Sequence, residues 1–334
     1  MKNRFAERAL TALALIAACA LRSAGSEETR AADVAGCVVA KDGTGQFKSV
    51  QDAINAAPQT RSASSPWTIR IRPGTYHELI YVQREKNFVR LLGDDPKDTT
   101  VTFNRYASMP SADGTALGTF HTPTVWIDAD DFSVSNLTIA NSSLRMGQAL
   151  AVRVDGDRVS FRNCRFLGWQ DTILANRGRH YFKGCTIVGA VDFIFGGATA
   201  FFDHCDIFCT GTGYITAAST PQGQPYGFVF SGCRIAGDAG AMTYLGRPWR
   251  SYANVIFLNT EMTRVVRPVG WHNWNQPERE KTARFAEFGS SGEGASPSAR
   301  ASWAKALTSS EAGGISAQRV FGGPDGWNPE SKAD

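Results

Sequence analysis

A six-residue pattern that recurs six times is the feature that most constrains how this chain can fold. Each copy begins and ends with an apolar residue and carries Asn, Gly or His at its third position. Its alternation of apolar and polar positions is typical of a strand. The copies start at residues 134, 161, 182, 202, 230 and 257, so the steps are 27, 21, 20, 28 and 27 residues. A period of this length indicates a solenoid in which each repeat is one coil.

Short strands, small turns and uneven insertions favour one architecture, an all-β, single-domain, right-handed parallel β-helix with short capping helices. Ser49 is expected to N-cap a helix that Pro58 ends and that covers the N-terminal end of the solenoid. Residues 302–311 are expected to form a short helix that returns along the solenoid. The Ser/Gly/Ala-rich segment 105–122 is expected to be a long loop beside the functional site.

Two carboxylates stand in unusually apolar surroundings between Leu167 and Ala198. Asp171 follows Trp169-Gln170, and Asp192 lies within Val-Asp-Phe-Ile-Phe. Counted back from the first residue of the next repeat, Gln148 lies 13 residues away, Asp171 11, and Asp192 and Arg247 10 each. Stacked coils therefore bring two carboxylates, two amides and a guanidinium to one face. The alternative, Asp side chains that merely cap turns, is disfavoured because aromatic residues flank both acids.

Several segments resemble the signature motifs of one enzyme family, the pectin methylesterases, and of its bacterial type. They are GQALAVR (147–153), GWQDTI (168–173), VDFIFGGA (191–198) and YLGRPWR (244–250), joined by matches at 74–78, 268–274 and 286–289. The resemblance covers residues 38–327. One departure is Gly197, where the family usually has Asn. The resemblance implies a pectinesterase that demethylates homogalacturonan to pectate and methanol, with no cofactor and no metal.

The residues suggest how such an ester would be hydrolysed. No Ser lies in G-x-S-x-G, and the five His residues have no metal-like spacing. Two adjacent acids cannot both ionise freely, so one keeps its proton. Arg247 is expected to hold Asp192 ionised as the nucleophile, while protonated Asp171 acts as proton donor and acceptor. Gln148 and Gln170 are expected to donate hydrogen bonds to the oxyanion.

The resemblance also assigns a substrate groove, whose predicted residues are Thr119, Gln148, Phe195, Arg247, Trp249 and Trp271. Three other functions are open to a solenoid of this kind. A polysaccharide lyase would need clustered carboxylates that bind Ca²⁺, and a galacturonan hydrolase would need an acid set suited to glycoside cleavage. A non-catalytic polysaccharide-binding solenoid would keep Trp249 and Trp271 and need neither acid.

The N-terminus resembles an export signal. Basic residues precede the uncharged run 9–21, which is too short to span a membrane. We expect a signal peptide at 1–22, a linker at 23–37, the pectinesterase domain at 38–328 and a tail at 329–334. The expected product is a secreted, extracellular or periplasmic monomer. The alternative is an outer-membrane lipoprotein anchored through Cys19.

Charge and cysteine content set two further limits. Removal of residues 1–22 takes away four basic residues and one acidic residue, so the net charge falls from +4 to +1. That value gives no basis for nucleic-acid binding. Four cysteines share the fourth position of the repeat and should stack on successive coils: Cys164, Cys185, Cys205 and Cys233. They predict either a disulfide, Cys185–Cys205 or Cys164–Cys185, or a row of buried free thiols.

Overall fold

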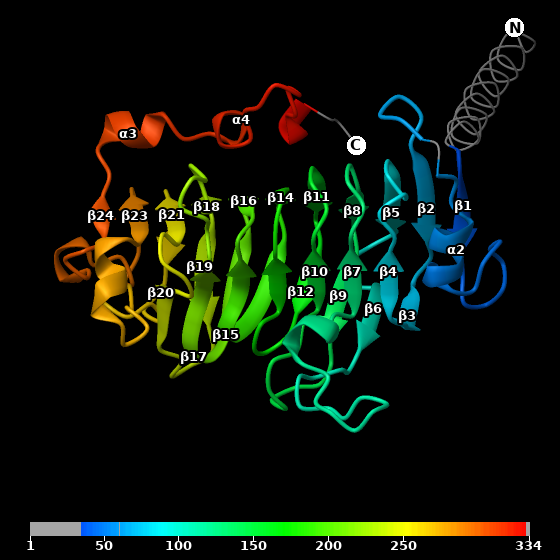
Figure 1. The fold of residues 1–334 in the computed structure, drawn as a ribbon, viewed down its shortest axis with the longest axis horizontal. Coiled ribbons are helices and arrows are strands. Elements are labelled where there is room, and N and C mark those ends of the chain that lie inside the picture. Colours follow the sequence, from blue (N-terminus) through cyan, green and yellow to red (C-terminus); the bar gives the residue numbers. More distant parts are fainter. Residues whose placement is uncertain (1–34, 60, 332–334) are drawn as a thin grey trace, which may run out of the picture. The chain divides into compact units, whose positions relative to one another are not determined.

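The computed structural model describes residues 35–59 and 61–331. The chain divides into a unit of residues 1–36 and a unit of residues 37–334, and the second unit is a parallel β-helix (Figure 1). The predicted signal peptide 1–22 and Cys19 lie outside the described residues. Within the described ranges, no helix is long and apolar enough to cross a membrane.

Two large sheets form the walls of the solenoid, and their strands pair in parallel from β2 to β24. The first, which we call sheet 1, contains in spatial order β1 (Gly36–Val39), β2 (Trp67–Ile71), β5 (Val89–Gly93), β8 (Ser133–Ser135), β11 (Val159–Arg162), β14 (Arg179–Lys183), β16 (Thr199–Asp203), β18 (Phe228–Ser231), β21 (Asn254–Leu258), β23 (Arg284–Phe288) and β24 (Lys305–Ala306).

The other sheet, sheet 2, carries the predicted site. Its main path contains β3 (Gly74–His77), β6 (Thr99–Phe103), β9 (Thr138–Asn141), β12 (Arg165–Leu167), β15 (Thr186–Gly196), β13 (Ile173–Ala175), β10 (Val152–Val154), β7 (Val125–Ile127) and β4 (Ile80–Val82). The long strand β17 (Asp206–Ala218) pairs with β15 and continues the sheet to β19 (Arg234–Gly237), β20 (Thr243–Pro248) and, through β19, β22 (Glu261–Met262).

The six-residue repeat is a corner between the two sheets, and not the single strand that its alternation predicts. In the second copy, β11 ends at Arg162, Asn163 has a φ of 49°, and β12 begins at Arg165. The third residue of every copy has a φ between 47° and 60°. Side chains with a Cβ disfavour this left-handed region, which Gly and Asn tolerate best. The Asn/Gly/His preference of the repeat therefore marks a turn of the chain at each coil.

Identical repeat positions stack into ladders inside the solenoid. The first residue of five copies contributes a row of phenylalanines, with successive ring centroids 4.4 to 4.8 Å apart, formed by Phe161, Phe182, Phe202, Phe230 and Phe257. Aromatic pairs of this kind add about 0.5 to 1.5 kcal/mol each beyond their buried area. The fourth position contributes the cysteines, and all six cysteines of the described part are buried free thiols. Of the two predicted arrangements, the structure has the free thiols.

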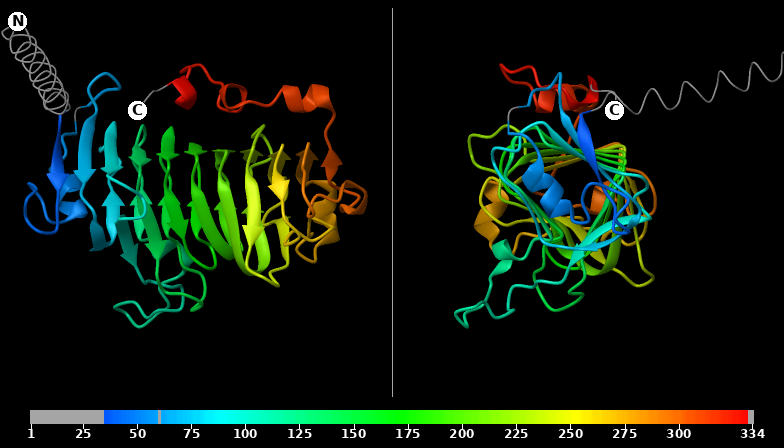
Figure 2. Two further views of the ribbon diagram at one scale, coloured as in Figure 1. Left: turned by 180° about the vertical axis from the view of Figure 1, so that it is seen from behind. Right: turned by 90° about the vertical axis from the view of Figure 1, so that its right-hand side faces the viewer.

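A helix covers the N-terminal end of the solenoid, and the chain after the last long strand carries further helical segments. Helix α2 (Val50–Ala56) begins after Ser49, whose hydroxyl accepts a hydrogen bond from the Asp52 N–H, as predicted. It lies across the first coils (Figure 2). The chain after β23 differs from the prediction of one helix over 302–311, since residues 305–306 pair as β24. The helical segments there are η3 (Pro297–Ala299), α3 (Ser309–Gly313), α4 (Ala317–Val320) and η4 (Pro329–Ser331).

This C-terminal segment does return along the outside of sheet 1, as predicted (Figure 1). Phe321 and Trp327 pack there against outward-facing apolar side chains of β14 and β16, including Tyr181 and Phe201. Residues 302–311 do not form one helix, because residues 305–306 pair with β23 as strand β24. Helix α3 begins only after the Thr308 capping box.

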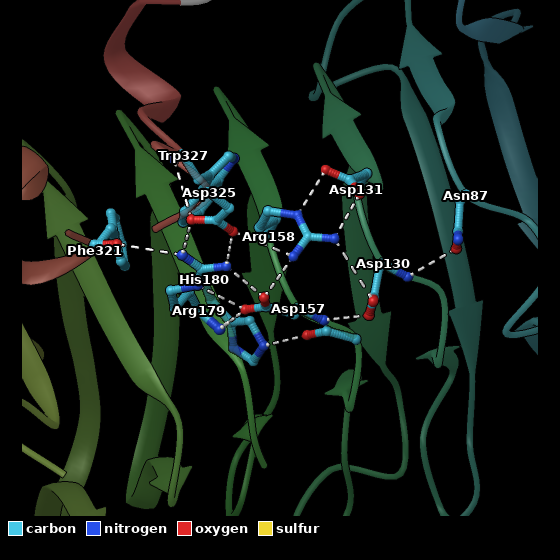
Figure 3. Close-up of polar contacts among 11 residues, drawn as sticks. Asn87, Asp130, Asp131, Asp157, Arg158, Arg179, His180, Phe321, Asp325 and Trp327 are labelled. Carbon is cyan, nitrogen blue, oxygen red and sulfur yellow. Dashed lines mark hydrogen bonds and ion pairs between the residues drawn. The ribbon is translucent and has the colours of Figure 1, made fainter. Parts of the chain in front are cut away.

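An ion-pair network, which we call the C-terminal clasp, fastens this segment to the solenoid (Figure 3). The Arg179 guanidinium lies 2.6 Å from the Asp157 carboxylate and 2.5 Å from that of Asp325. Arg158 donates to Asp131 at 2.8 Å and contacts Asp157 at the same distance. The clasp joins the turns that precede β8 and β11, together with the first residue of β14, to the C-terminal segment.

Candidate active site

Both predicted carboxylates lie where sheet 2 departs from regular strand geometry. Asp171 lies two residues before β13, and its N–H donates to the Val191 carbonyl on the next coil at 3.0 Å. Asp192 lies in β15 within the second of two register shifts relative to β17, the one between Val191 and Ile194. Both residues adopt left-handed conformations, with φ values of 64° and 50°. Non-Gly residues in this region cost about 1 to 2 kcal/mol, and such strain is concentrated at functional sites.

Arg247 on β20 reaches back over two coils to Asp192. Its Nε donates to Asp192 Oδ1 at 2.8 Å and its Nη2 to Oδ2 at 2.5 Å, which is a two-pronged contact. The guanidinium carbon lies 3.8 Å from the Tyr214 ring centroid and 3.7 Å from that of Trp274. Two aromatic faces and one carboxylate therefore fix the orientation of this arginine.

Burial separates the two acids electrostatically. Asp171 is 8% exposed and Asp192 is 6% exposed. Loss of hydration, reinforced by the negative charge of Asp192, raises the pKa of Asp171 to about 8. Burial also raises the pKa of Asp192, but the hydrogen bonds and charge of Arg247 oppose that rise. At neutral pH Asp171 keeps its proton, and Asp192 is the acid that gives its proton up more readily.

The two predicted amides stand on consecutive coils beside the acids. Gln148 and Gln170 are aligned by a parallel bridge, and Gln170 is aligned in turn with Val191, the residue before Asp192. Gln148 is exposed and Gln170 half-buried. Neither side chain has a hydrogen-bond partner among residues 35–59 and 61–331, so both amides are available to a bound molecule.

The predicted groove residues differ in exposure: Trp249 and Thr119 are half-buried, whereas Phe195 is buried. Trp249 is half-buried, its ring centroid lies 6.5 Å from that of Phe120, and the adjacent Thr119 is also half-buried in η1 (Thr119–His121). The loop 105–122 therefore does stand beside the site, as predicted. Phe195 is only 5% exposed and lies beneath Trp249, at 5.8 Å between ring centroids.

The prediction that the Trp271 side chain lines the substrate groove is wrong. Trp271 is 2% exposed, packs on Phe285 at 4.6 Å between ring centroids, and donates its Nε1–H to Glu287. A parallel bridge aligns Trp271 with Gly246, the inward neighbour of Arg247. Since side chains alternate along a strand, Trp271 must point into the core.

Trp274, three residues later, occupies the place expected for Trp271. It has a φ of 63° and stacks on Arg247. Tyr214, on the other side of the guanidinium, was also missed. The available sequence signal for Trp274 was its place in the quoted segment 268–274. Nothing in that segment shows which side chains point into the core and which point outward. Tyr214 follows a Gly/Thr run and carried no distinguishing signal.

Counting back from the repeats brought the right residues together but gave the wrong register for Arg247. In the sheet, Arg247 is aligned through Ala217 with Phe195, three residues beyond Asp192. The register shifts in β15 produce the difference. A metal centre has no donor set in the described part of the chain, where no three His, Cys, Asp or Glu residues form a suitable group.

Comparison with known proteins identifies the family. The pectinesterase family model matches residues 36–322. Pectinesterase 31 of Arabidopsis thaliana is 42% identical over 282 residues, covering 82% of this chain and 88% of the relative. Pectinesterase 4 of the same plant is 34% identical and matches 88% of this chain but only 52% of its own length. These relatives are plant proteins, so the narrower bacterial type stays a prediction.

Solved structures agree in fold. Pectin methylesterase from carrot has a TM-score of 0.80 and 31% identity, covering 86% of this chain and 93% of the carrot chain. A mutant pectin methylesterase in complex with a hexasaccharide has a TM-score of 0.76 and 30% identity, covering 87% and 97%. The parallel β-helix prediction is confirmed, and the chain belongs to the pectinesterase family.

Proposed function

We propose that the chain hydrolyses the methyl esters of homogalacturonan, with Asp192 as nucleophile and Asp171 as proton donor and acceptor. The observation that carries this proposal is the asymmetric acid pair. One acid is held by a two-pronged arginine, and its neighbour on the adjacent coil has a pKa of about 8. The hexasaccharide complex of a structural neighbour supports a polysaccharide substrate.

The first step is acyl transfer. The Asp192 carboxylate attacks the ester carbonyl carbon, and the carbonyl π electrons move to the oxygen. The amide N–H groups of Gln148 and Gln170 donate to this oxyanion. When the tetrahedral intermediate collapses, the C–O bond to the methoxy group breaks, and the Asp171 proton goes to the leaving oxygen. Methanol departs and leaves an anhydride between Asp192 and the galacturonate carboxyl carbon.

The second step returns the enzyme to its starting state. Asp171, now ionised, takes a proton from a water molecule that attacks the galacturonyl carbon of the anhydride. The bond to Asp192 breaks, and the galacturonic acid product and the Asp192 carboxylate are released. Asp171 is protonated again. The raised pKa of Asp171 suits both directions of this proton transfer, because an efficient acid/base has a pKa near the working pH.

The groove and the cellular location complete the proposal. Thr119 and Trp249 line the groove for the sugar chain, with Phe195 beneath Trp249 and Trp274 in the place first assigned to Trp271. The protein acts outside the cytoplasm as a secreted monomer after removal of residues 1–22. Lipid attachment at Cys19 is the alternative. Mass analysis of the N-terminus of exported protein distinguishes a free terminus from a lipidated Cys19.

The decisive experiment measures the products formed from methylated pectin by the wild-type and Asp192→Asn proteins. Methanol release indicates the esterase, unsaturated ends a lyase, new reducing ends a hydrolase, and no product a binding protein. Asp192→Asn keeps the side-chain shape but lacks the nucleophilic charge, so kcat should fall by at least about 10⁴-fold. Near-normal methanol release from the folded variant would show that Asp192 is not the nucleophile.

A further inference from the structure

A row of outward-facing side chains on sheet 2 leads from the acid pair toward the N-terminal coils. The pairing of β4, β7, β10 and β13 aligns Tyr81, Trp126, Arg153 and Leu174, and the last is aligned with Phe195, the buried ring beneath Trp249. Trp126 lies three coils from Phe195, which corresponds to about 14 Å at the ordinary strand spacing. The row is therefore a continuation of the same face, beyond the catalytic residues.

A pocket of about 270 Å³ opens at the far end of this row. Tyr81 and Trp126 supply its aromatic wall, with ring centroids 5.3 Å apart. Tyr81 is 41% exposed. The opposite wall comes from the loop 105–122, which contributes Arg105 and His121. An aromatic ring beside a guanidinium is a suitable surface for a sugar that carries a carboxylate.

Several hydrogen bonds hold the loop that forms this wall to the solenoid, and two of them reach the coil that contains Gln148 and Arg153. The Ala107 N–H donates to the carbonyl of Gln148 at 2.9 Å. Arg153 donates to the carbonyl of Phe120 at 3.1 Å, and its guanidinium carbon lies 4.0 Å from the Trp126 ring centroid. One wall of the pocket is thus bonded directly to the coil that carries a predicted oxyanion donor.

The charges around the pocket are unbalanced in favour of an anion. Asp155 is already bound by Arg153 at 2.6 Å and by the Trp126 Nε1–H at 2.8 Å. Asp128 contacts the guanidinium groups of Arg84 and Arg177 at 3.7 and 3.4 Å, and the Tyr81 hydroxyl donates to it.

Arg105 differs from these arginines. Across the residues that the structure describes, its guanidinium has no carboxylate and no hydrogen-bond acceptor within reach, although it lines the pocket. A half-buried guanidinium without a protein partner can bind a carboxylate from a ligand at little cost in reorganisation. The exposed His121 adds a second N–H donor on the same wall.

We propose that this pocket binds de-esterified galacturonate, with the free carboxylate on Arg105 and the sugar ring against Tyr81. The inference rests on the proposed function, because it concerns the product of that reaction. A stretch of chain that has already lost its methyl groups would be held here while the acid pair acts on an ester several sugars away. The pocket thereby favours pectin that is partly de-esterified over pectin that is fully esterified.

Binding of a de-esterified galacturonate oligomer tests the proposal directly. Calorimetry at low ionic strength should show that Arg105→Gln and Tyr81→Ala each weaken the affinity, Arg105→Gln by about fivefold to twentyfold for the loss of one charged hydrogen-bonding group. The affinity of the wild-type protein should fall as salt is added. Arg264→Gln, at an exposed arginine after β22, is the matched control and should bind as the wild type does.

Kinetics give an independent measurement. For Arg105→Gln, KM should rise more on partly de-esterified pectin than on fully esterified pectin, with the change in KM and not in kcat. Equal effects on both substrates, or oligomer affinities no lower than that of Arg264→Gln, would overturn the proposal. Failure of the proposed function looks different, since the wild-type protein would then release no methanol from either pectin.

Discussion

The acid pair and the C-terminal clasp are built from the same two residue types, and they behave in opposite ways. In the clasp, Arg179 and Arg158 give the Asp157 carboxylate a full set of N–H donors, and these outweigh burial and lower its pKa. In the site, a single guanidinium serves two carboxylates. The pKa of Asp171 rises to about 8 because it is buried beside Asp192.

The difference lies in the number of hydrogen-bond donors that each buried carboxyl group receives. Asp157 accepts three hydrogen bonds from Arg179 alone, counting its backbone N–H. Over the described ranges the Asp171 carboxyl group accepts none. Desolvation without compensating donors favours the protonated acid, whereas donors favour the carboxylate. The arrangement of donors, and not the presence of Asp and Arg, therefore determines which cluster can transfer a proton.

The largest expected effect that tests this contrast comes from Asp171→Asn. Loss of the proposed proton donor should lower kcat by about 10²- to 10⁴-fold. In the wild-type protein, methanol release should also fall as the pH rises through about 8, where Asp171 loses its proton. The residual activity of the variant should lack this alkaline limb. A variant that keeps the limb would place the titrating group elsewhere.

The same variant should change how stability depends on pH. The folded-state pKa of Asp171 is raised, so its contribution to stability is fully present below about pH 4 and is lost as the pH rises toward 8. The slope is at most about 1.4 kcal/mol per pH unit. Denaturant unfolding at several pH values should therefore show a flatter profile for Asp171→Asn than for the wild type in this window.

Substitution of the amides should have the next largest effect. Gln170→Ala or Gln148→Ala removes one proposed oxyanion donor, and loss of such a donor typically lowers kcat by about 10²- to 10³-fold. The contact strengthens only as charge develops, so KM should change little. Steady-state kinetics on methylated pectin measure both constants. A rise in KM at unchanged kcat would make these amides substrate-binding groups and no part of an oxyanion site.

Arg247→Ala tests the other half of the contrast, the single guanidinium of the site. Its removal should raise the pKa of Asp192 further and move the acid limb of the pH–rate profile upward by about 1 to 3 pH units. Arg247→Lys keeps the charge but lacks the planar guanidinium that lies between Tyr214 and Trp274. The acid limb of its pH–rate profile should therefore lie between those of the wild type and Arg247→Ala. An unchanged acid limb in Arg247→Ala would show that another group ionises there.

The solenoid could be predicted from the sequence because each copy of the repeat marks one coil, and six copies show that the coils are stacked in series. The period, the N-cap at Ser49 and the convergence of Asp171, Asp192 and Arg247 could all be read from residue types and spacing. The sequence did not predict that each repeat is a corner, because alternation over six residues does not distinguish one strand from two strands joined by a left-handed residue such as Asn163. The distinction depends on the backbone φ of the third residue of the repeat.

The errors within the site have one physical source, strand parity. Trp271 and Trp274 are equally plausible groove residues by composition, and only the alignment of Trp271 with Gly246 places it in the core. Likewise, the bulges around Asp192 shift Arg247 by three residues from its counted position. A single extra residue exchanges the two faces of a strand, so side-chain direction cannot be inferred where bulges are present.

The clasp should show the smallest effect, and one on stability alone. Arg179→Ala removes the donors that join Asp157 to Asp325 and should lower the free energy of unfolding by about 1 to 3 kcal/mol, with kcat and KM for pectin unchanged.

The pKa of Asp157 is lowered in the folded protein, so its contribution to stability is present above its ordinary pKa and is lost as the pH falls through the folded value. The difference in unfolding free energy between wild type and Arg179→Ala should therefore be constant near neutral pH and shrink in acid, below about pH 4. This is opposite in sign to the dependence expected for Asp171. A matched loss of methanol release in Arg179→Ala, or a stability difference that grows in acid, would mean that the two clusters are coupled and that the contrast between them fails.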